Sequence, residues 1–323
     1  MKQAQESYKS FNTLKMYLGL NGEDYWHIDY QEYDHPYDGK SYFWDLSQKA
    51  VLCTGPFDEN GILEFVDADN NKCKHVINIC HYAIGAYEMF LKSNDEKYRI
   101  TFLNHAKWLC DNQEDYHGIS GVWILKYPAY LYGLEGNSVS AMAQGMGIST
   151  LTRAYLLTNN NKFIISAKEA VNIFSINVLK GGVSRQISDN FLCFEEYSTL
   201  DSPSCVLNGF ISAILGLYDL LEIDDYSFAR ELYENGLSSL SENISRWDCK
   251  IWSLYDLYIP NTKNYSSYFY HKYHIKQLRA LYRITGNEIF LNYSKKWDKY
   301  INNPIYKFMA LLIKILYRIN RRL

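Results

Sequence analysis

The chain has 323 residues, a length that buries a large hydrophobic core in one or two domains. Charged residues make up 21% of the chain and the net charge is −3 with both signs interspersed, so no basic field predicts nucleic-acid binding. Tyrosine is abundant at 30 residues, and its amphipathic ring serves both protein cores and grooves that bind sugars.

Residues 1–73 are predicted to form a short irregular or β-containing segment packed on the rest of the protein. Turn-forming residues punctuate this segment, as in the run TGPFDENGI. Its first 20 residues contain neither a continuous apolar core nor a cleavage site, so no signal peptide is predicted. We therefore expect a cytoplasmic location.

Residues 74–303 are predicted to be a succession of helices. The runs HVINICHYAIGAYEMFLKS and EKYRITFLNHAKWLCDNQ carry apolar residues at helical spacing. The runs SVSAMAQGMGISTLTRAYLLT and VLNGFISAILGLYDLLEI are apolar on nearly every side, and an amphipathic run follows each of them. A helix that is apolar all round is buried, whereas a striped helix lies in an outer layer. The sequence therefore predicts a mainly α-helical protein, an α/α barrel of alternating inner and outer helices.

The segments between these helices are expected to carry the function. The run GISGVWILKYPAYLYGLEGN indicates a turn and an extended segment, and GGVSRQISDNFLCFEEY indicates a hairpin. The segments that carry Glu196, Tyr255 and Tyr270 occupy equivalent places in the alternation. We expect these three side chains to converge at one end of the barrel.

Residues 304–323 predict a basic amphipathic helix. The run from Phe308 to Leu316 is apolar, and the basic residues around it are Lys307, Lys314, Arg318, Arg321 and Arg322. Such a helix can lie on an anionic membrane surface, which would place the protein peripherally at the inner membrane face. The alternative is a final helix packed on the body, with a basic end that suits its dipole.

Neither a disulfide framework nor a metal site is predicted. The seven cysteines are scattered and form no C-x-x-C pair. His271 and His274 share a helix face, but no third ligand has suitable spacing, so helix capping or contact with sugar hydroxyls is the favoured role. No nucleotide-binding motif is present, because Gly145-Met146-Gly147 does not follow a predicted strand. We expect no cofactor.

Two features suggest a functional site. The first is the run of Glu195, Glu196 and Tyr197 just before a buried helix. Acids in such loops are commonly solvated. If one of them is buried instead, burial would raise the pKa of its carboxyl group and make it a usable acid or base. Gln144, Gly145 and Gly147 interrupt an apolar helix, and glycine there indicates close approach of another backbone or of a ligand.

Four blocks, SAMAQGMGISTLTRAYLLT, EEYSTLDSPSCVLNGFISAILGLYDL, LYDL and YHKYHIKQL, in this order and spacing, resemble the C-terminal catalytic domain of D-glucuronyl C5-epimerases. Those enzymes convert glucuronate to iduronate within heparan-type polysaccharides. The resemblance covers roughly residues 74–303, implies an α/α toroid, and looks closer to the short bacterial members found among capsule genes. The resemblance also implies a homodimer. The residues of this chain that match the catalytic residues of the family are Glu196, Tyr197, Tyr255 and Tyr270.

The chain departs from the animal enzymes in four places, one of which is a loop before VLNGF that is one residue longer. Tyr255 and Tyr270 are separated by three residues fewer, Tyr258 stands where the animal enzymes have an arginine, and the animal N-terminal β-domains are replaced by about 75 residues of different character. The resemblance implies a uronate-containing polysaccharide such as heparosan as the substrate.

The chemistry implied by the resemblance needs two proton-transfer groups, because C5 loses a proton on one face of the sugar and regains one on the other. We expect Glu196 on one face and Tyr270 on the other, with Tyr255 as a relay and Tyr197 shaping the pocket. The expected substrate contacts are Gln144, Arg185, Asn208, Tyr258, His271 and His274.

Three other activities remain open at this point. A uronate lyase begins with the same C5 proton loss and then expels the C4 substituent. A glycoside hydrolase would need two opposed carboxyl groups, and the sequence offers one clear acid site. A catalytically silent polysaccharide-binding protein in capsule assembly would fit the altered loops and the missing arginine.

Overall fold

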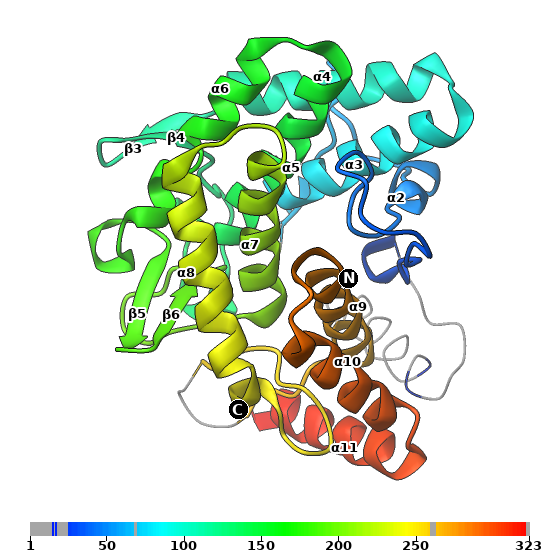
Figure 1. The fold of residues 1–323 in the computed structure, drawn as a ribbon, viewed down its shortest axis with the longest axis vertical. Coiled ribbons are helices and arrows are strands. Elements are labelled where there is room, and N and C mark those ends of the chain that lie inside the picture. Colours follow the sequence, from blue (N-terminus) through cyan, green and yellow to red (C-terminus); the bar gives the residue numbers. More distant parts are fainter. Residues whose placement is uncertain (1–14, 16, 18–24, 68–69, 259–262, 321–323) are drawn as a thin grey trace.

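The computed structural model describes residues 15, 17, 25–67, 70–258 and 263–320, which form a mainly helical protein (Figure 1). Within these residues four helices form an inner layer: α3 (Val76–Ser93), α5 (Ala141–Thr158), α7 (Leu207–Leu221) and α9 (Tyr268–Thr285). An outer helix follows each of them: α4 (Glu96–Asp111), α6 (Asn161–Glu169), α8 (Ser227–Asn243) and α10 (Glu288–Ile301). Each inner helix contacts its outer partner, and α3, α5, α7 and α9 contact one another in sequence. The predicted α/α barrel is confirmed.

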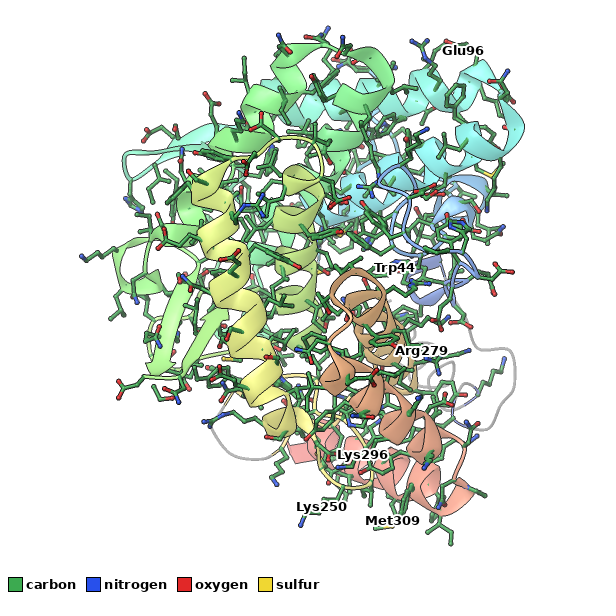
Figure 2. All side chains as sticks on the ribbon, viewed as in Figure 1. Trp44, Glu96, Lys250, Arg279, Lys296 and Met309 are labelled. Carbon is green, nitrogen blue, oxygen red and sulfur yellow. The ribbon has the colours of Figure 1, made fainter. Side chains whose placement is uncertain are left out.

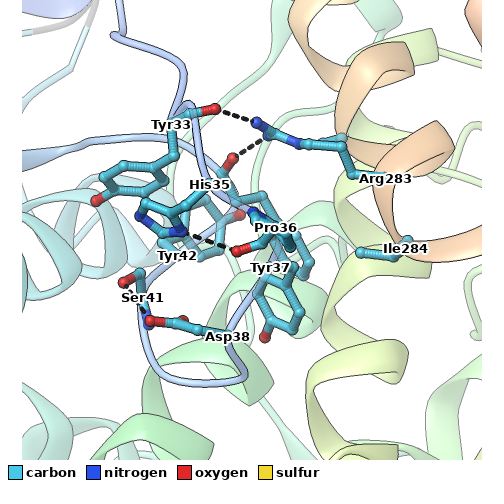
Figure 3. Close-up of a pocket in the computed structure, with 11 residues that line it drawn as sticks. Tyr33, His35, Pro36, Tyr37, Asp38, Ser41, Tyr42, Arg283 and Ile284 are labelled. Atoms are coloured by element: carbon cyan, nitrogen blue, oxygen red, sulfur yellow. Dashed lines mark hydrogen bonds between the residues drawn. The ribbon is translucent and has the colours of Figure 1, made fainter.

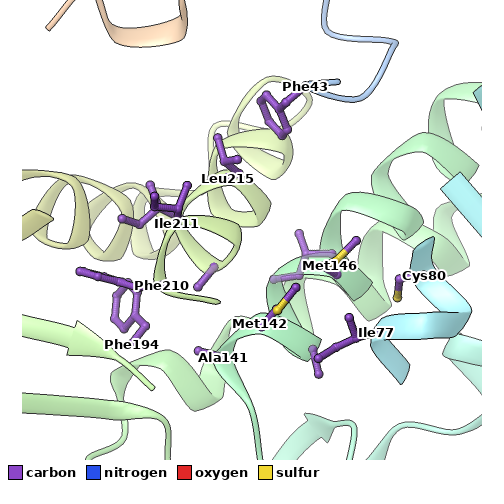
Figure 4. Packing of buried hydrophobic residues seen from close by; sticks show 14 of the residues in the cluster. Phe43, Ile77, Cys80, Ala141, Met142, Met146, Phe194, Phe210, Ile211 and Leu215 are labelled. Carbon is purple, nitrogen blue, oxygen red and sulfur yellow. The ribbon is translucent and has the colours of Figure 1, made fainter. Parts of the chain in front are cut away.

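The inner helices α5 and α7 pack closely because glycine lies at their crossing. A Cβ atom on Gly216 of α7 would lie 2.2 Å from the carbonyl oxygen of Gly145 in α5, and one on Gly145 would lie 2.6 Å from the carbonyl oxygen of Ser212. The predicted close approach of another backbone at Gly145 is thus confirmed. Met146 and Leu215 belong to the apolar contact around these helices (Figure 4).

Residues 25–52 close the ring between α9 and α3. This segment contains a 3₁₀ turn, η1 (Tyr25–His27), and the short helix α2 (Ser47–Val51). The ring of Trp44 meets Tyr273 of α9 edge-on at 5.3 Å, and the ring of Tyr30 lies 6.4 Å from His81 of α3. This part of the expected irregular segment therefore packs between α9 and α3.

Buried polar contacts hold residues 25–52 against the inner helices. Arg153 of α5 pairs with Asp219 of α7 at 2.6 Å, and its guanidinium also donates to the carbonyl oxygen of Ser41 at 2.7 Å. Arg283 of α9 donates to the carbonyl oxygens of Tyr33 and Phe43, at 2.8 and 2.7 Å (Figure 3). Side chains far along the chain thereby satisfy backbone groups that a coil segment leaves unpaired.

Short antiparallel ladders lie between the helices, and they are β1 (Phe65–Val66) with β2 (Lys72–Cys73), β3 (Glu114–Tyr116) with β4 (Ile119–Val122), and β5 (Ser184–Ser188) with β6 (Phe191–Phe194). The β5–β6 pair, in which Ser184 opposes Phe194, confirms the predicted hairpin. The remaining 3₁₀ turns are η2 (Tyr130–Tyr132), η3 (Asn172–Ser175), η4 (Val178–Lys180) and η5 (Ile244–Trp247).

The last described helix, α11 (Pro304–Asn320), contacts α10. Arg321 and Arg322, which were expected to extend its basic character, lie outside the described residues. Within the part of the chain that the structure describes, no helix combines the length and the apolar character needed to cross a membrane.

The alternation of inner and outer helices brings the N-terminal ends of the inner helices to one end of the barrel. Each outer helix returns the chain along its inner partner, so the inner helices run in the same direction. Ser140 caps α5 and Ser267 caps α9, whereas α7 begins without a side-chain cap. The described residues that lead into the inner helices at this end are 123–140 before α5, 195–206 before α7, and 248–258 with 263–267 before α9.

Candidate active site

The structure brings Glu196, Tyr197, Tyr255 and Tyr270 together where α7 and α9 begin. Glu196 and Tyr197 follow strand β6, Tyr255 lies in the segment before α9, and Tyr270 is in the first turn of α9. The rings of Tyr255 and Tyr270 meet edge-on with centroids 4.8 Å apart. Tyr255 also interacts electrostatically with Glu196 and Tyr197. Residues separated by up to 74 positions thus form one cluster.

Backbone hydrogen bonds hold the segments of this cluster in place. The amide of Leu207, the first residue of α7, donates to the carbonyl oxygen of Tyr255 at 3.1 Å. The amide of Ala141, the first residue of α5, donates to the carbonyl oxygen of Glu195 at 2.8 Å. The unpaired N–H groups at the start of a helix therefore anchor the segments that carry the candidate catalytic side chains.

The carboxyl group of Glu196 is buried, with 6% of the residue exposed. Burial raises its pKa to about 8, the nearby Asp256 also raises it, and hydrogen bonds from Tyr197 and Asn208 oppose the rise. The bond from Nδ2 of Asn208 to Oε2 of Glu196 is 3.3 Å long. A carboxyl group with this pKa can both accept and donate a proton near neutral pH.

Gly209 makes room for Glu196 against the first turn of α7. A Cβ atom on Gly209 would lie 2.4 Å from Oε2 and 2.6 Å from Cβ of Glu196. The carboxyl group of Glu196 therefore lies against the first turn of α7, which begins without a side-chain cap. The positive end of a helix dipole favours negative charge close to it.

Tyrosine rings lie around the carboxyl group of Glu196. Tyr132 stacks on Tyr197 with ring centroids 4.0 Å apart, and Tyr258 meets Tyr132 edge-on at 5.3 Å. Burial raises the pKa of Tyr197 and of Tyr255 well above the ordinary value, so both phenols stay protonated near neutral pH. They are therefore suited to donate hydrogen bonds or protons.

Three members of this neighbourhood were not predicted as site residues. Tyr127 raises the pKa of Tyr197, Tyr132 forms the stack described above, and Asp256 accepts a 2.7 Å hydrogen bond from the Tyr132 hydroxyl group. Tyr127 and Tyr132 lie in the extended segment before α5, which is equivalent to the segment before α7. That equivalence, together with the density of tyrosines, is the signal that could have identified them.

Of the predicted substrate contacts, Asn208 and Tyr258 lie in the cluster. Gln144 is fully buried on α5, where its side-chain amide donates to the carbonyl oxygen of Trp123 at 3.3 Å. The structure therefore ties Gln144 to the segment before α5 and gives its Oε1 no hydrogen-bond partner.

The structure does not bring Arg185 to the cluster as a substrate contact. Its Nε donates to Oε1 of Glu195 at 3.0 Å, and its guanidinium also donates to the carbonyl oxygen of Thr199. Glu195 further accepts the backbone amides of Ser204 and Cys205, at 3.2 and 2.7 Å. Arg185 and Glu195 thus fold the loop that presents Glu196.

His271 and His274 are likewise fully buried in the wall behind the cluster. Nδ1 of His271 lies 2.8 Å from Oγ of Ser253, its Nε2 lies 3.1 Å from the carbonyl oxygen of Trp297, and its ring stacks on Trp252. Burial lowers the pKa of His271 to about 3, so this imidazole is neutral. Both histidines hold the Tyr255 segment against α9 instead of facing a substrate.

Among the described residues one group, Cys193, Glu195 and Cys205, has the spacing of metal ligands, with ligand atoms within 4.8 Å of one another. The carboxylate of Glu195 is already satisfied by Arg185, Ser204 and the amide of Cys205. Burial raises the pKa of both thiols, which favours the neutral thiol over the thiolate that metals bind. The group fits a structural role better than a metal centre.

Part of the chain is similar to known proteins. Residues 117–299 match the family described as D-glucuronyl C5-epimerase C-terminus. The chain is 34% identical over 220 residues to D-glucuronyl C5-epimerase of Caenorhabditis elegans, covering 64% of this chain and 35% of the nematode protein. It is also 34% identical over 179 residues to an uncharacterised protein of Methanocaldococcus jannaschii, covering 54% of this chain and 56% of the archaeal one. The chain thus spans about a third to just over half the length of these relatives.

Solved structures share the fold. Cellobiose 2-epimerase from Bacillus thermoamylovorans B4167 superimposes with a TM-score of 0.57 at 12% identity, over 91% of this chain and 74% of that one. A D-mannose isomerase superimposes with a TM-score of 0.52 at 10% identity, over 78% and 66%. The family match, by contrast, covers more than half of the chain and includes the whole Glu196, Tyr255 and Tyr270 cluster. The chain belongs to the D-glucuronyl C5-epimerase C-terminus family.

Proposed function

We propose that this protein is a carbohydrate epimerase that converts D-glucuronate to L-iduronate residues within a heparosan-like polysaccharide. The observation that carries the proposal is the buried Glu196 carboxyl group, with a pKa of about 8, beside a cluster of protonated phenols. The family membership and the name of the nematode relative support it.

The reaction inverts C5, whose hydrogen lies α to the sugar carboxylate. Breaking the C5–H bond leaves its electron pair delocalised into the carboxylate as an enediolate. A proton must then reach C5 from the opposite face of the ring. Two side chains on opposite sides of the sugar, a carboxyl group and a phenol, meet this requirement.

We assign Glu196 the role of the base in the direction from glucuronate to iduronate. A carboxyl group with a pKa of about 8 is ionised in a useful fraction of molecules near neutral pH. The Tyr255 phenol, whose pKa burial raises well above its ordinary value, is protonated there. Tyr270 meets Tyr255 at 4.8 Å, and we assign it the donation of the new proton to C5. Tyr255 then gives its proton to the Tyr270 phenolate and takes up the proton that Glu196 holds, which restores all three groups.

Hydrogen-bond donors are needed to stabilise the negative charge that develops on the substrate. The hydroxyl groups of Tyr197 and Tyr255 lie beside Glu196. Such preorganised donors contribute several kcal/mol to enediolate formation because they need no reorganisation during the reaction. Tyr258, which stands at the position of the animal arginine, belongs to the same group of tyrosine rings.

The Tyr270→Phe variant tests this assignment, because it removes the proposed proton donor and keeps the ring. Iduronate formation in heparosan, read by proton NMR, should fall by about 10²-fold or more. Tyr233→Phe on the outer helix α8, another partly buried tyrosine, is the matched control and should retain the wild-type rate. An unchanged rate in Tyr270→Phe would refute the assignment, and an unsaturated, ultraviolet-absorbing product would indicate a lyase instead.

A further inference from the structure

Asp256 is a buried acid directly beside the candidate active site. It follows Tyr255 in the chain, and 2% of the residue is exposed. Its Oδ2 accepts a hydrogen bond from the hydroxyl group of Tyr132 at 2.7 Å and another from Nδ2 of Asn264 at 2.6 Å. Because Tyr132 stacks on Tyr197, a single hydrogen bond connects Asp256 to the rings around the candidate base.

The last helix contributes a positive charge to this network. Lys314 of α11 donates to Oδ1 of Asn264 at 2.7 Å, and Asn264 in turn donates to Asp256. Burial raises the pKa of Asp256, and the bonds from Tyr132 and Asn264 and the charge of Lys314 oppose the rise. A buried carboxylate is costly unless it is hydrogen-bonded and paired with a cation, and this network provides both.

The backbone on either side of Asp256 is held against the loop that carries Glu196. The amide of Leu257 donates to the carbonyl oxygen of Ser204 at 2.9 Å, and the carbonyl oxygen of Tyr255 accepts the amide of the first residue of α7 at 3.1 Å. The two acids therefore keep a fixed relation to each other, in which the charge of Asp256 raises the pKa of Glu196.

The other groups around the two acids are mostly neutral. Glu196 is faced by the amide of Asn208 and by four phenols with raised pKa, those of Tyr127, Tyr132, Tyr197 and Tyr255. Asp256 is faced by the Tyr132 hydroxyl group, the Asn264 amide, the Tyr258 backbone, the Cys205 thiol and the Lys314 ammonium group. A phenol or thiol with a raised pKa carries no charge near neutral pH, so Asp256 supplies a charge that these groups do not.

We propose that Asp256 is a positioning residue of the candidate active site: its carboxylate, held by Tyr132 and by Asn264 with Lys314, supplies a fixed negative charge next to Glu196. The charge acts through Glu196, because a carboxylate that binds its proton more tightly is a stronger base toward the weakly acidic C5 hydrogen. The inference rests on the proposed function, in which Glu196 takes that proton.

Asp256→Asn tests the proposal, because it removes the charge and keeps the shape of the side chain. Both hydrogen bonds to Asp256 end on the same oxygen, so an amide oxygen in its place accepts both. The matched control is Asp248→Asn, in the same segment before α9, where Asp248 pairs with Lys296 of α10 (Figure 2). Asp256→Ser removes the same charge with a smaller side chain and replaces Asp256→Asn if thermal unfolding shows that variant to be unfolded.

NMR of the Glu196 carboxyl carbon measures the effect without any substrate. The protein is isotopically labelled at the glutamate carboxyl carbons, and the signal of Glu196 is the one that Glu196→Gln lacks. The titration midpoint should be about 8 in wild type and in Asp248→Asn. In Asp256→Asn it should be lower by about half a pH unit or more, because a nearby negative charge is gone. Equal midpoints in Asp256→Asn and wild type overturn the proposal.

The pH profile of iduronate formation from heparosan gives a second readout. In Asp256→Asn the midpoint of kcat/KM should move to lower pH together with the NMR midpoint, because Glu196 is then ionised at lower pH. A lower rate at every pH with both midpoints unchanged would mean that Asp256 is merely structural, and would also overturn the proposal. Wild type that forms no iduronate would refute the proposed function, and the NMR titration would still decide the role of Asp256.

Discussion

At the scale of single residues, two neighbouring acids have opposite roles. Strand β6 ends at Phe194, and the extended chain beyond it turns Glu195 and Glu196 to different sides. Glu195 accepts hydrogen bonds from Arg185 and from the amides of Ser204 and Cys205, which oppose the rise in its pKa that burial causes. Glu196 has fewer hydrogen-bond donors around its carboxyl group and lies in the cluster with Tyr197, Tyr255 and Tyr270. The first acid builds the loop, and we propose that the second performs the chemistry.

The raised pKa of Glu196 predicts a pH-dependent stability. Between the ordinary value of 4.5 and the folded value of about 8, the folded protein holds a proton that the unfolded chain has lost. The free energy of unfolding should therefore fall as pH rises through this window, by a few kcal/mol at most from this group. In Glu196→Gln this contribution should be absent, so the variant gains stability relative to wild type as pH rises.

Urea unfolding at about pH 5 and about pH 8 measures this difference. Glu231→Gln, an exposed glutamate on α8, is the control and should follow the wild-type profile. Profiles of wild type and Glu196→Gln that run parallel would mean that Glu196 is not buried in its neutral form.

The same pKa predicts how the reaction depends on pH. If Glu196 is the base, only its ionised form removes the C5 proton, so kcat/KM should rise with pH and level off above about 8. Initial rates on heparosan across this range provide the measurement. A rate that instead falls as pH rises toward 8 would assign Glu196 the role of the acid.

At the scale of elements, the crossing of α5 and α7 sets the position of the site. Both helices are buried, and backbone meets backbone at Gly145 and Gly216. This close approach places the start of α7, with Asn208 and Gly209, beside the hairpin that carries Glu196. Side chains larger than hydrogen at the crossing would separate the two helices.

Gly216→Ala tests this dependence. The new Cβ would lie 2.2 Å from the carbonyl oxygen of Gly145, so the backbone itself must move. We expect a net loss of about 2 kcal/mol in the free energy of unfolding, even though alanine favours a helix by up to about 1 kcal/mol over glycine. Asn235→Ala, an exposed change on α8, should stay within about 0.5 kcal/mol of wild type. Equal stability of Gly216→Ala and wild type would contradict the tight crossing.

The helices could be predicted because their signals are local. Stripes of apolar residues and all-apolar runs lie within single segments, and so does the turn at the β5–β6 hairpin. The position of Glu196 also followed from its place before a buried helix. The partner of Arg185 and the stack of Tyr132 on Tyr197 could not be predicted, because they depend on how separate loops meet. A sequence shows a cation or an aromatic ring but not its neighbour in space.

At the scale of the whole molecule, an irregular segment completes the barrel. Residues 25–52 have little regular structure, and their contacts with the inner helices join positions 112 and 240 residues apart, as for Ser41 with Arg153 and Phe43 with Arg283. No local pattern predicts such contacts. The buried pair of Arg153 and Asp219 lies at the centre of this closure, where the hydroxyl group of Tyr37 also donates to Asp219.

Asp219→Asn tests whether the buried pair of Arg153 and Asp219 stabilises the packing of residues 25–52 on the inner helices. It leaves Arg153 as an uncompensated charge in the core, so we expect a loss of about 3 kcal/mol or more in the free energy of unfolding. Asp225→Asn is the matched control, because Asp225 forms an exposed pair with Arg230 and its loss should cost no more than about 1 kcal/mol. Urea titrations measure both variants, and equal losses would show that the buried pair does not hold residues 25–52 against the inner helices.

The central claim, that the protein inverts C5 of a polymer-bound uronate by proton exchange, is tested most directly in deuterated water. Wild-type protein is incubated with heparosan, and the product is read by proton NMR. We expect loss of the C5 proton signal through deuterium incorporation, together with the appearance of iduronate signals. A polymer that shows neither deuterium at C5 nor iduronate, with protein shown to be folded, would contradict the proposed reaction on this substrate.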